Sequence, residues 1–186
     1  MHFISIHEDA PYWDKYTISN GVAEIFSTLL ERLMRKNTFL TKQFKVSKEV
    51  AEDALERTRF MELFFLTFYA ANSLMKIEFW EENLSMEQAN ERYERHAEEF
   101  MGMSLPGKYW QLHHIMPDFD LYSPSYVVAA VRAAELDRKL ENLFGANWWT
   151  DKRAGNYIRS VASDGASTNL SRFSKLDTRP YLKHLL

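Results

Sequence analysis

The chain has 186 residues, of which 46% are hydrophobic and 15% aromatic, so it contains enough apolar material for one domain with a sizeable core. Its 23 basic residues are scattered among 26 acidic ones, which gives a formal charge of −3 and argues against nucleic acid or an anionic membrane surface as a partner. The sequence has no cysteine, which excludes disulfides, thiol catalysis and thiolate metal sites and fits a cytoplasmic protein.

The remaining composition predicts an all-α fold. There are only 6 glycines and 5 prolines, and most of them lie between periodic segments. Residues 1–8 have the pattern of the tail of a helix, and Pro11 follows in a turn. We expect further helices at 16–36, 48–82, 85–100, 123–144, 150–163 and 168–176. No internal repeat is evident, so residues 1–186 are predicted to form a single helical domain.

Capping residues mark several of these helix ends. Ser47 is a plausible cap for helix 48–82, and Ser85-Met-Glu-Gln88 is a capping box for helix 85–100. Gly102 and Gly145 suit positions just beyond helix ends, and Ser123-Pro124 is a strong helix start. In helix 85–100 we expect Tyr93, His96 and Phe100 to face inward and the charged residues to form a solvated face.

Helix 48–82 is the most apolar part of the chain. Its stretch 63–71 is too short to span a bilayer, and no signal peptide is visible at the amino terminus. Apolar side chains surround the helix between 60 and 69, which predicts a central core helix. The alternative is that part of this surface is exposed and promotes self-association. The apolar residues are Phe60, Met61, Leu63, Phe64, Phe65, Leu66, Phe68 and Tyr69.

Helix 16–36 carries two carboxylates on one face. Its apolar residues recur at helical spacing, whereas Glu24 and Glu31 fall on the other side. Seven positions separate these two residues, which corresponds to about two turns or ~10 Å along the axis. They therefore point the same way without crowding each other. By spacing alone, a solvated helix face is the plainer interpretation.

The segment Tyr16-Thr-Ile, followed by Val22-Ala-Glu-Ile-Phe-Ser-Thr28 and Glu31, resembles the helix that supplies the third zinc ligand in the thimet oligopeptidase and oligoendopeptidase F family. In that family a His-Glu-x-Gly-His helix gives two histidine ligands and a general-base glutamate. The resemblance puts Glu24 in the ligand position and implies a supporting role for Glu31. Met1-His-Phe-Ile-Ser-Ile-His7 looks like the residues that follow the second ligand histidine, so we expect the chain to begin just after the catalytic motif, as a truncated member.

No His-Glu-x-x-His occurs in the 186 residues. His2 and His7 are five positions apart, which on a helix separates them by about 140°, so they are a poor substitute for the i, i+4 pair of a zinc peptidase. Zinc is the cofactor that the resemblance implies. Because two ligands and the general base are missing, we expect this chain alone neither to bind stoichiometric zinc nor to hydrolyse peptides.

Later segments extend the resemblance. Leu143-Phe-Gly-Ala-Asn-Trp-Trp-Thr150, Ala154-Gly-Asn-Tyr157 and Ser163-Asp-Gly-Ala-Ser167 look like the carboxyl-terminal part of oligoendopeptidase F relatives. Trp110 with His114-Ile115, followed by Pro124-Ser-Tyr126, is similar to a segment in which a histidine or tyrosine stabilises the oxyanion.

This oxyanion segment departs from the family pattern. Val127 and Ala130 stand where relatives have tyrosines, and extra residues separate His114 from Pro124. Tyr126 and then His114 are the catalytic candidates, with His113 a close rival to His114. The alternative is that the histidines are ordinary loop residues and Tyr126 is a half-buried ring.

The resemblance therefore implies an all-α domain like the carboxyl-terminal half of a zinc oligopeptidase, a metallopeptidase that hydrolyses short peptides. Its reaction would be zinc-promoted attack of water on the peptide bond. The alternative is a non-catalytic helical remnant or pseudoenzyme that binds a peptide or protein, or self-associates through helix 48–82. Loss of the tyrosines favours the alternative beyond mere truncation, whereas intact Glu24 and Glu31 favour a peptidase chain that was only recently, or artificially, cut.

Overall fold

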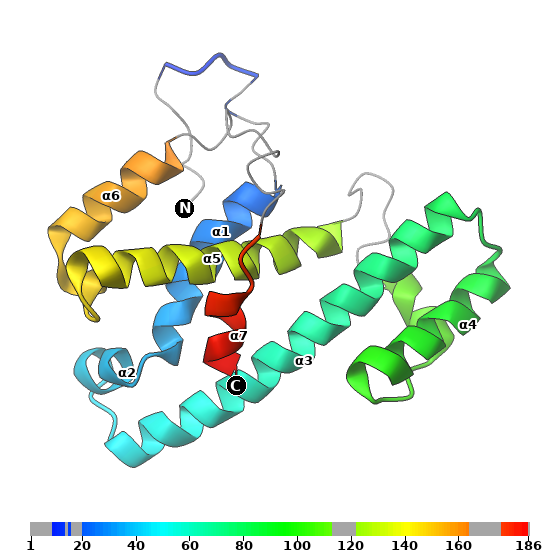
Figure 1. Cartoon of the computed structure of the whole chain (residues 1–186), viewed down its shortest axis with the longest axis horizontal. Helices are drawn as coiled ribbons and strands as arrows, with labels where there is room; N and C mark the ends of the chain where they lie inside the picture. The colour runs from blue at the N-terminus through cyan, green and yellow to red at the C-terminus, as the bar shows by residue number, and fades with distance from the viewer. Residues whose placement is uncertain (1–8, 14, 16–19, 113–121, 164–175, 186) are drawn as a thin grey trace. The chain divides into compact units, whose positions relative to one another are not determined.

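The structure is a computed structural model that describes residues 9–13, 15, 20–112, 122–163 and 176–185. Every regular element in these ranges is helical, as the sequence predicts (Figure 1). None of the helices in these ranges is sufficiently long and apolar to cross a membrane. The expected helical tail at 1–8 and the expected helix 168–176 lie outside the described residues.

The chain divides into two compact units, one formed by residues 1–59 and 128–186 and the other by residues 60–127. Two long helices, α3 (Lys48–Glu81) and α5 (Tyr122–Phe144), contribute residues to both units. Each unit has a hydrophobic core of its own.

In the first unit, helices α1, α5 and α6 bury one shared core. α1 and α5 cross each other in Figure 1, and the core joins Phe26 and Leu29 of α1 to Leu140 of α5 and Ile158 of α6. The unit also contains shorter elements around this core. Its helices besides α3 and α5 are α1 (Asn20–Glu31), the 3₁₀ turn η3 (Arg32–Arg35), α2 (Asn37–Gln43), the 3₁₀ turn η7 (Trp148–Thr150), α6 (Lys152–Ala162) and α7 (Arg179–Leu185).

The expected end of helix 16–36 near Lys36 is confirmed, but the helix that follows it was not expected. The α-helix ends at Glu31, a 3₁₀ turn follows, and Lys36 takes an extended conformation (φ −109°, ψ 114°). A new helix, α2, then begins at Asn37, where we had expected the helix to end. Leu40 of α2 is buried and Phe39 packs edge-on against Trp149, with ring centroids 5.6 Å apart. Tertiary packing of these two side chains therefore favours a helix that local propensity does not predict.

The expected helix boundaries after residue 140 are confirmed as far as the structure describes them. Gly145 has φ +84° just beyond α5, a conformation that glycine adopts without steric cost. Asp151 caps α6 by accepting a hydrogen bond from the backbone N–H of Arg153 at 2.8 Å. α6 buries Ala154, Ile158 and Ala162, which are four positions apart and share one face.

The second unit packs α4 (Met86–His96) against the last turns of α3 (Figure 1). Met75 of α3, Ala89 and Tyr93 of α4 and Trp110 form its core. Trp110 lies in the 3₁₀ helix η5 (Gly107–Leu112) and donates from Nε1 to Asn90 Oδ1 at 2.9 Å. The stretch between the expected helices 85–100 and 123–144 therefore contains a short helical element.

The ends of α4 match the sequence. Ser85 Oγ accepts from the Gln88 N–H at 3.3 Å, while Gln88 Oε1 accepts from the Ser85 N–H at 2.9 Å, so the capping box is present. A π-helical turn, η4 (Ala97–Met101), continues the helix to Gly102, which has φ +63°. The expected end of this helix is confirmed.

The expectation of a core helix between 60 and 69 is wrong. None of the eight apolar side chains there is buried, and Phe60, Met61, Leu63 and Phe65 are exposed. The buried side chains of α3 are instead small or polar at several positions, including Asn72, Ser73 and Lys76. The physical reason is length: 34 residues span about 50 Å, whereas the α3 contribution to the second core centres on Met75. The structure thus agrees with the alternative of an exposed apolar surface.

Candidate functional site

Glu24, the expected metal ligand, lies on the half-buried side of α1. The opposite face of the helix carries Phe26 and Leu29 into the first core, which fixes the rotation of the helix about its axis. Ser27, one turn on, places its Oγ 2.8 Å from Glu24 Oε2 and 3.0 Å from the Glu24 carbonyl oxygen. The hydroxyl therefore orients the carboxylate, as supporting hydrogen bonds orient metal ligands in proteins.

Glu31, two turns further along, differs from Glu24 in its surroundings. It is exposed and immediately precedes η3, whereas Glu24 is half-buried. The two carboxylates are therefore not equivalent, although their spacing is the same as expected. The supporting role of Glu31 in a metal site stays a prediction.

Tyr126, the first catalytic candidate, is half-buried in the first turns of α5. Its ring stacks on Tyr69 of α3 with centroids 4.6 Å apart and planes at 25°, and it meets Tyr122 edge-on at 5.0 Å. The aromatic contacts hold the ring in place, and the half-buried state matches the plainer of the two interpretations. His114, the second candidate, and its rival His113 lie outside the described residues.

The described residues do not bring a metal-binding set together. In the ranges that the structure covers, no three His, Asp or Glu side chains are grouped closely enough to hold a metal ion. His2 and His7 are not among the described residues. A zinc ion takes three or four protein ligands, so Glu24 and its described neighbours provide one ligand and not a complete site.

A lysine and a serine meet inside the second unit. Lys76 of α3 is 4% exposed, and its Nζ lies 3.4 Å from Oγ of Ser123, a fully buried residue of α5. Burial disfavours the ammonium ion and lowers the pKa of Lys76 to about 8. A lysine of this kind is a possible general base, and a Ser–Lys pair is known in nucleophilic catalysis. Because Ser123 is inaccessible to substrate, the contact here holds α5 to α3.

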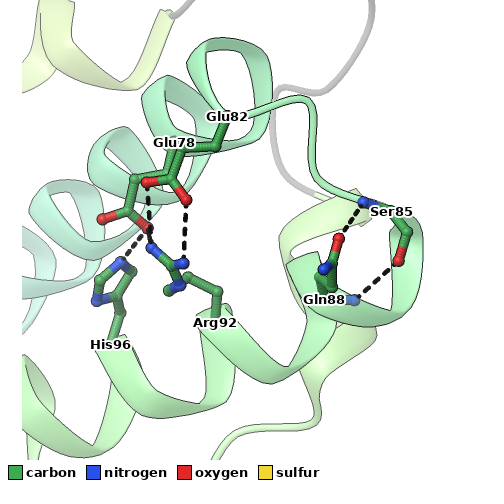
Figure 2. Close-up of polar contacts among 6 residues, drawn as sticks. All are labelled: Glu78, Glu82, Ser85, Gln88, Arg92 and His96. Carbon is green, nitrogen blue, oxygen red and sulfur yellow. Dashed lines mark hydrogen bonds and ion pairs between the residues drawn. The ribbon is translucent and has the colours of Figure 1, made fainter.

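A second polar cluster joins α3 to α4 (Figure 2). Glu78 accepts from Arg92 Nη1 at 3.0 Å and lies 2.9 Å from Nε2 of His96, through the same oxygen, Oε2. Arg92 also pairs with Glu82 at 3.1 Å, and this hydrogen bond raises the pKa of the guanidinium. His96 is buried, as expected, whereas Phe100, which was also expected to face inward, is exposed. The cluster links residues from two helices and is suited to hold α4 in place.

Sequence reasoning missed three of these groups. Ser27 lies three positions after Glu24, a spacing at which helical side chains meet, and this could have indicated the contact. Asn72 and Lys76 are four apart within an apolar helix, a pattern that could have indicated a buried polar face. The partnership of His96 with Glu78 could not have been found, because it depends on how α4 packs against α3.

Comparison with known proteins adds no assignment: no family model, no curated protein and no solved structure matches the chain.

Proposed function

We propose that this chain belongs to a zinc-dependent oligopeptidase and that Glu24 is a carboxylate ligand of its metal. The observation that carries the proposal is the anchoring of Glu24. Its helix is held by the first core, and its carboxylate is hydrogen-bonded by Ser27, within the same Ala-Glu-Ile-Phe-Ser-Thr segment. A metal ligand needs such orientation, whereas a carboxylate that only solvates a helix does not.

The proposed substrate class is short peptides, and bound zinc would supply Lewis-acid chemistry to the attack of water on the peptide bond. The 186 residues contain no His-Glu-x-x-His. Two histidine ligands and a general base would therefore have to come from another polypeptide segment. The proposed contribution of this chain is one oriented carboxylate, and we expect no hydrolysis from the chain alone.

The experiment is a complementation. The purified chain is mixed with a synthetic helical peptide that carries His-Glu-x-Gly-His, and bound zinc is measured by equilibrium dialysis together with cleavage of a fluorogenic peptide. We expect stoichiometric zinc with the wild-type mixture and at least about tenfold weaker zinc binding with Glu24→Gln, the size of effect seen when metal-site groups are lost.

The matched control is Glu56→Gln, which removes an exposed carboxylate on α3. It should bind zinc like the wild type. If Glu24→Gln binds zinc as well as the control, or if the mixture binds none, the ligand assignment of Glu24 is wrong. Stoichiometric zinc bound by the chain alone would contradict the proposal that its other ligands come from elsewhere.

A second candidate function is self-association without catalysis, favoured by the exposed apolar surface of α3. Phe60 is 69% exposed and Leu63 is 49% exposed, on the same side of the helix. Exposed apolar surface of this kind favours association, and two copies of one helix can pack through the same patch on each. The occupant we propose is therefore a second copy of this chain.

Sedimentation velocity over a range of concentrations tests this candidate. We expect a concentration-dependent dimer that becomes a monomer in the double variant Phe60→Ser/Leu63→Ser. The control is Val50→Ser, at an exposed apolar position of the same helix outside this patch. A wild-type chain that stays monomeric at every concentration, or a dimer that the double variant leaves intact, would contradict it.

A further inference from the structure

A pocket of about 580 Å³ lies beside α6 in the first unit. Its volume falls in the range of about 300–1,000 Å³ that is typical of small-molecule sites. Residues of α1, η3, η7 and α6 line it, and Glu24 is not among them, so the pocket is separate from the proposed metal ligand. The apolar residues of the lining are Leu30, Leu33, Trp148, Trp149 and Ile158.

Three of these apolar side chains are held by the first core. Leu33, Trp148 and Ile158 are buried and belong to the same hydrophobic cluster. Leu30 differs from them, because 42% of it remains exposed to water. The pocket therefore offers apolar surface that is already in place, and a ligand that covers this surface gains hydrophobic stabilisation.

The indole ring of Trp149 forms a flat part of the lining. Two neighbouring rings hold it in position: Phe39 of α2 meets it with a centroid distance of 5.6 Å and Trp148 with one of 6.2 Å, both edge-on. Aromatic pairs of rings gain stabilisation beyond the apolar area that they bury, so a fixed indole favours an aromatic ligand over an aliphatic one of the same size. The pocket is therefore suited to a planar aromatic ring.

Gly155 also lines the pocket, and the usual reasons for a glycine do not apply to it. It is the fourth of the 11 residues of α6, and it is not one of the described glycines with positive φ, which are Gly102 and Gly145. A Cβ atom at position 155 would have no neighbour within 4 Å, so close packing does not require a glycine either. Because glycine is less favourable than alanine inside a helix, this position gives up helix stability.

An ordinary surface glycine is the plainer alternative. Gly155, however, is half-buried, and it lies on the face of α6 that lines the pocket. At spacings of three and four residues, Lys152, Gly155, Asn156 and Arg159 share that face. Gly155 is the position on it without a side chain, so a ligand can approach the backbone of the helix there.

The start of α6 gives no reason to propose an anion as the ligand. Asp151 Oδ1 accepts a hydrogen bond from the N–H of Arg153 at 2.8 Å, and the Asp151 carbonyl oxygen accepts from the N–H groups of Ala154 and Gly155 at 3.0 and 3.4 Å. These donors of the first turn are therefore already used. Asp151 also lines the pocket, and its carboxylate would repel a second negative group.

We propose that this pocket binds a small, planar aromatic molecule that carries a polar group at its edge. The aromatic ring lies against the backbone at Gly155, contacts Trp149 and covers the exposed part of Leu30. The polar group bonds to Thr150 or Asn156, which are exposed residues of the lining with hydrogen-bonding side chains. Binding here needs no metal, so its test is independent of the proposed zinc chemistry.

An NMR titration of the isotope-labelled chain with 2-naphthol, a planar bicyclic molecule with a hydroxyl group, tests this proposal. We expect saturable binding of one molecule per chain, with the largest chemical-shift changes at the backbone N–H of Gly155 and the indole N–H of Trp149. Decahydro-2-naphthol has the same carbon skeleton and hydroxyl group but no planar ring. It should bind roughly threefold more weakly or worse, because it makes no aromatic contact with the indole.

Gly155→Leu fills the space beside α6 and should weaken the binding of 2-naphthol by about tenfold or more. Gly155→Ala should weaken binding less, and it should raise the midpoint of thermal denaturation because alanine favours the helix. The matched control is Ser160→Leu, which adds a leucine at an exposed position of α6 that does not line the pocket. It should bind within about twofold of the wild type, because the two positions are independent.

Binding of 2-naphthol that Gly155→Leu weakens and Ser160→Leu leaves unchanged supports the proposal. If Gly155→Leu loses the wild-type circular dichroism spectrum, Gly155→Ala decides: weaker binding in a more stable chain supports a glycine that serves the ligand, and unchanged binding contradicts it. The proposal is wrong if 2-naphthol does not bind saturably, if the shift changes centre on residues 60–69 of α3, or if Gly155→Leu binds like the control. Equal binding of decahydro-2-naphthol would show that the pocket does not select a planar ring.

Discussion

Helices α1 and α3 are both rich in apolar residues, but the apolar stripe of α1 is buried whereas the apolar stretch 60–69 of α3 is not. In α1 the periodic apolar residues are the buried ones, and Leu29 has no exposed surface. In α3 the leucine Leu63 is 49% exposed while Lys76 is 4% exposed. An amphipathic pattern therefore predicted which face of α1 would be buried, whereas an all-round apolar pattern predicted the wrong burial for α3.

The difference arises because the apolar pattern of α1 specifies one buried face of the helix, whereas the apolar pattern of α3 between 60 and 69 does not. α1 has a single apolar stripe, so only one rotation about its axis removes that stripe from water. Between 60 and 69, α3 has no polar face that must stay in contact with water. Its own sequence therefore favours no particular rotation of the helix about its axis. The contacts that α3 makes elsewhere along its 34 residues decide which side chains are buried.

The largest expected effect compares one leucine in each helix. Leu29→Ala should lower the free energy of unfolding by about 2–5 kcal/mol, because it leaves a cavity in the first core. Leu63→Ala should cost less than about 1 kcal/mol, since half of that side chain is already in water. Urea denaturation followed by circular dichroism measures both.

Leu30→Ala, at an exposed position next to Leu29, is the control within α1 and should also have a small effect. If Leu63→Ala destabilises the protein as much as Leu29→Ala, α3 does have a buried apolar side at this position and the contrast between the helices disappears.

The next effect concerns the buried amine of α3. The pKa of Lys76 is lowered to about 8 in the folded protein, whereas an unfolded lysine titrates near about 10.4. Between these values the unfolded state binds more protons, so the contribution of Lys76 to stability rises with pH. Below about pH 8 both states are protonated, and the cost of burying the charge is present in full.

Relative to the wild type, Lys76→Met should therefore be more stable at about pH 7 than at about pH 10, by roughly 2–3 kcal/mol in the free energy of unfolding. The measurement is the difference in free energy of unfolding between variant and wild type at each pH, in which titration of all other groups cancels. Lys42→Met, which removes an exposed lysine, should show no such pH dependence. If the difference in free energy of unfolding between Lys76→Met and the wild type does not change with pH, burial does not lower the pKa of this lysine.

The smallest effect tests the polar anchor between α3 and α4. Glu78→Gln weakens the contacts with both Arg92 and His96 and should lower the free energy of unfolding by about 1 kcal/mol, because a charged acceptor is replaced by a neutral one. Thermal denaturation measures the change. The neighbouring exposed Glu81 serves as control: Glu81→Gln should have an effect within about 0.5 kcal/mol. Equal effects at the two positions would mean that the cluster contributes no more than an ordinary surface charge.

The candidate site was only partly predictable. Glu24 and its position on a helix followed from sequence, and the Ser27 contact was within reach of a spacing argument. Tyr126 was predicted to be either a catalytic donor or a half-buried ring, and its stacking on Tyr69 depends on the pairing of α3 with the start of α5. A cavity lined by residues of η3, α5 and α7 could not have been predicted, because Arg35, Arg138 and Lys183 are far apart in the sequence.

Sequence alone determined the all-helical class and most helix ends, because caps such as Ser85, Gly102, Gly145 and Asp151 act within a few residues of themselves. Only the tertiary structure decided that a new helix, α2, begins at Asn37 and that α3 buries Lys76. Both outcomes depend on partners remote in sequence, whose packing can override a local preference of a few tenths of a kcal/mol per residue.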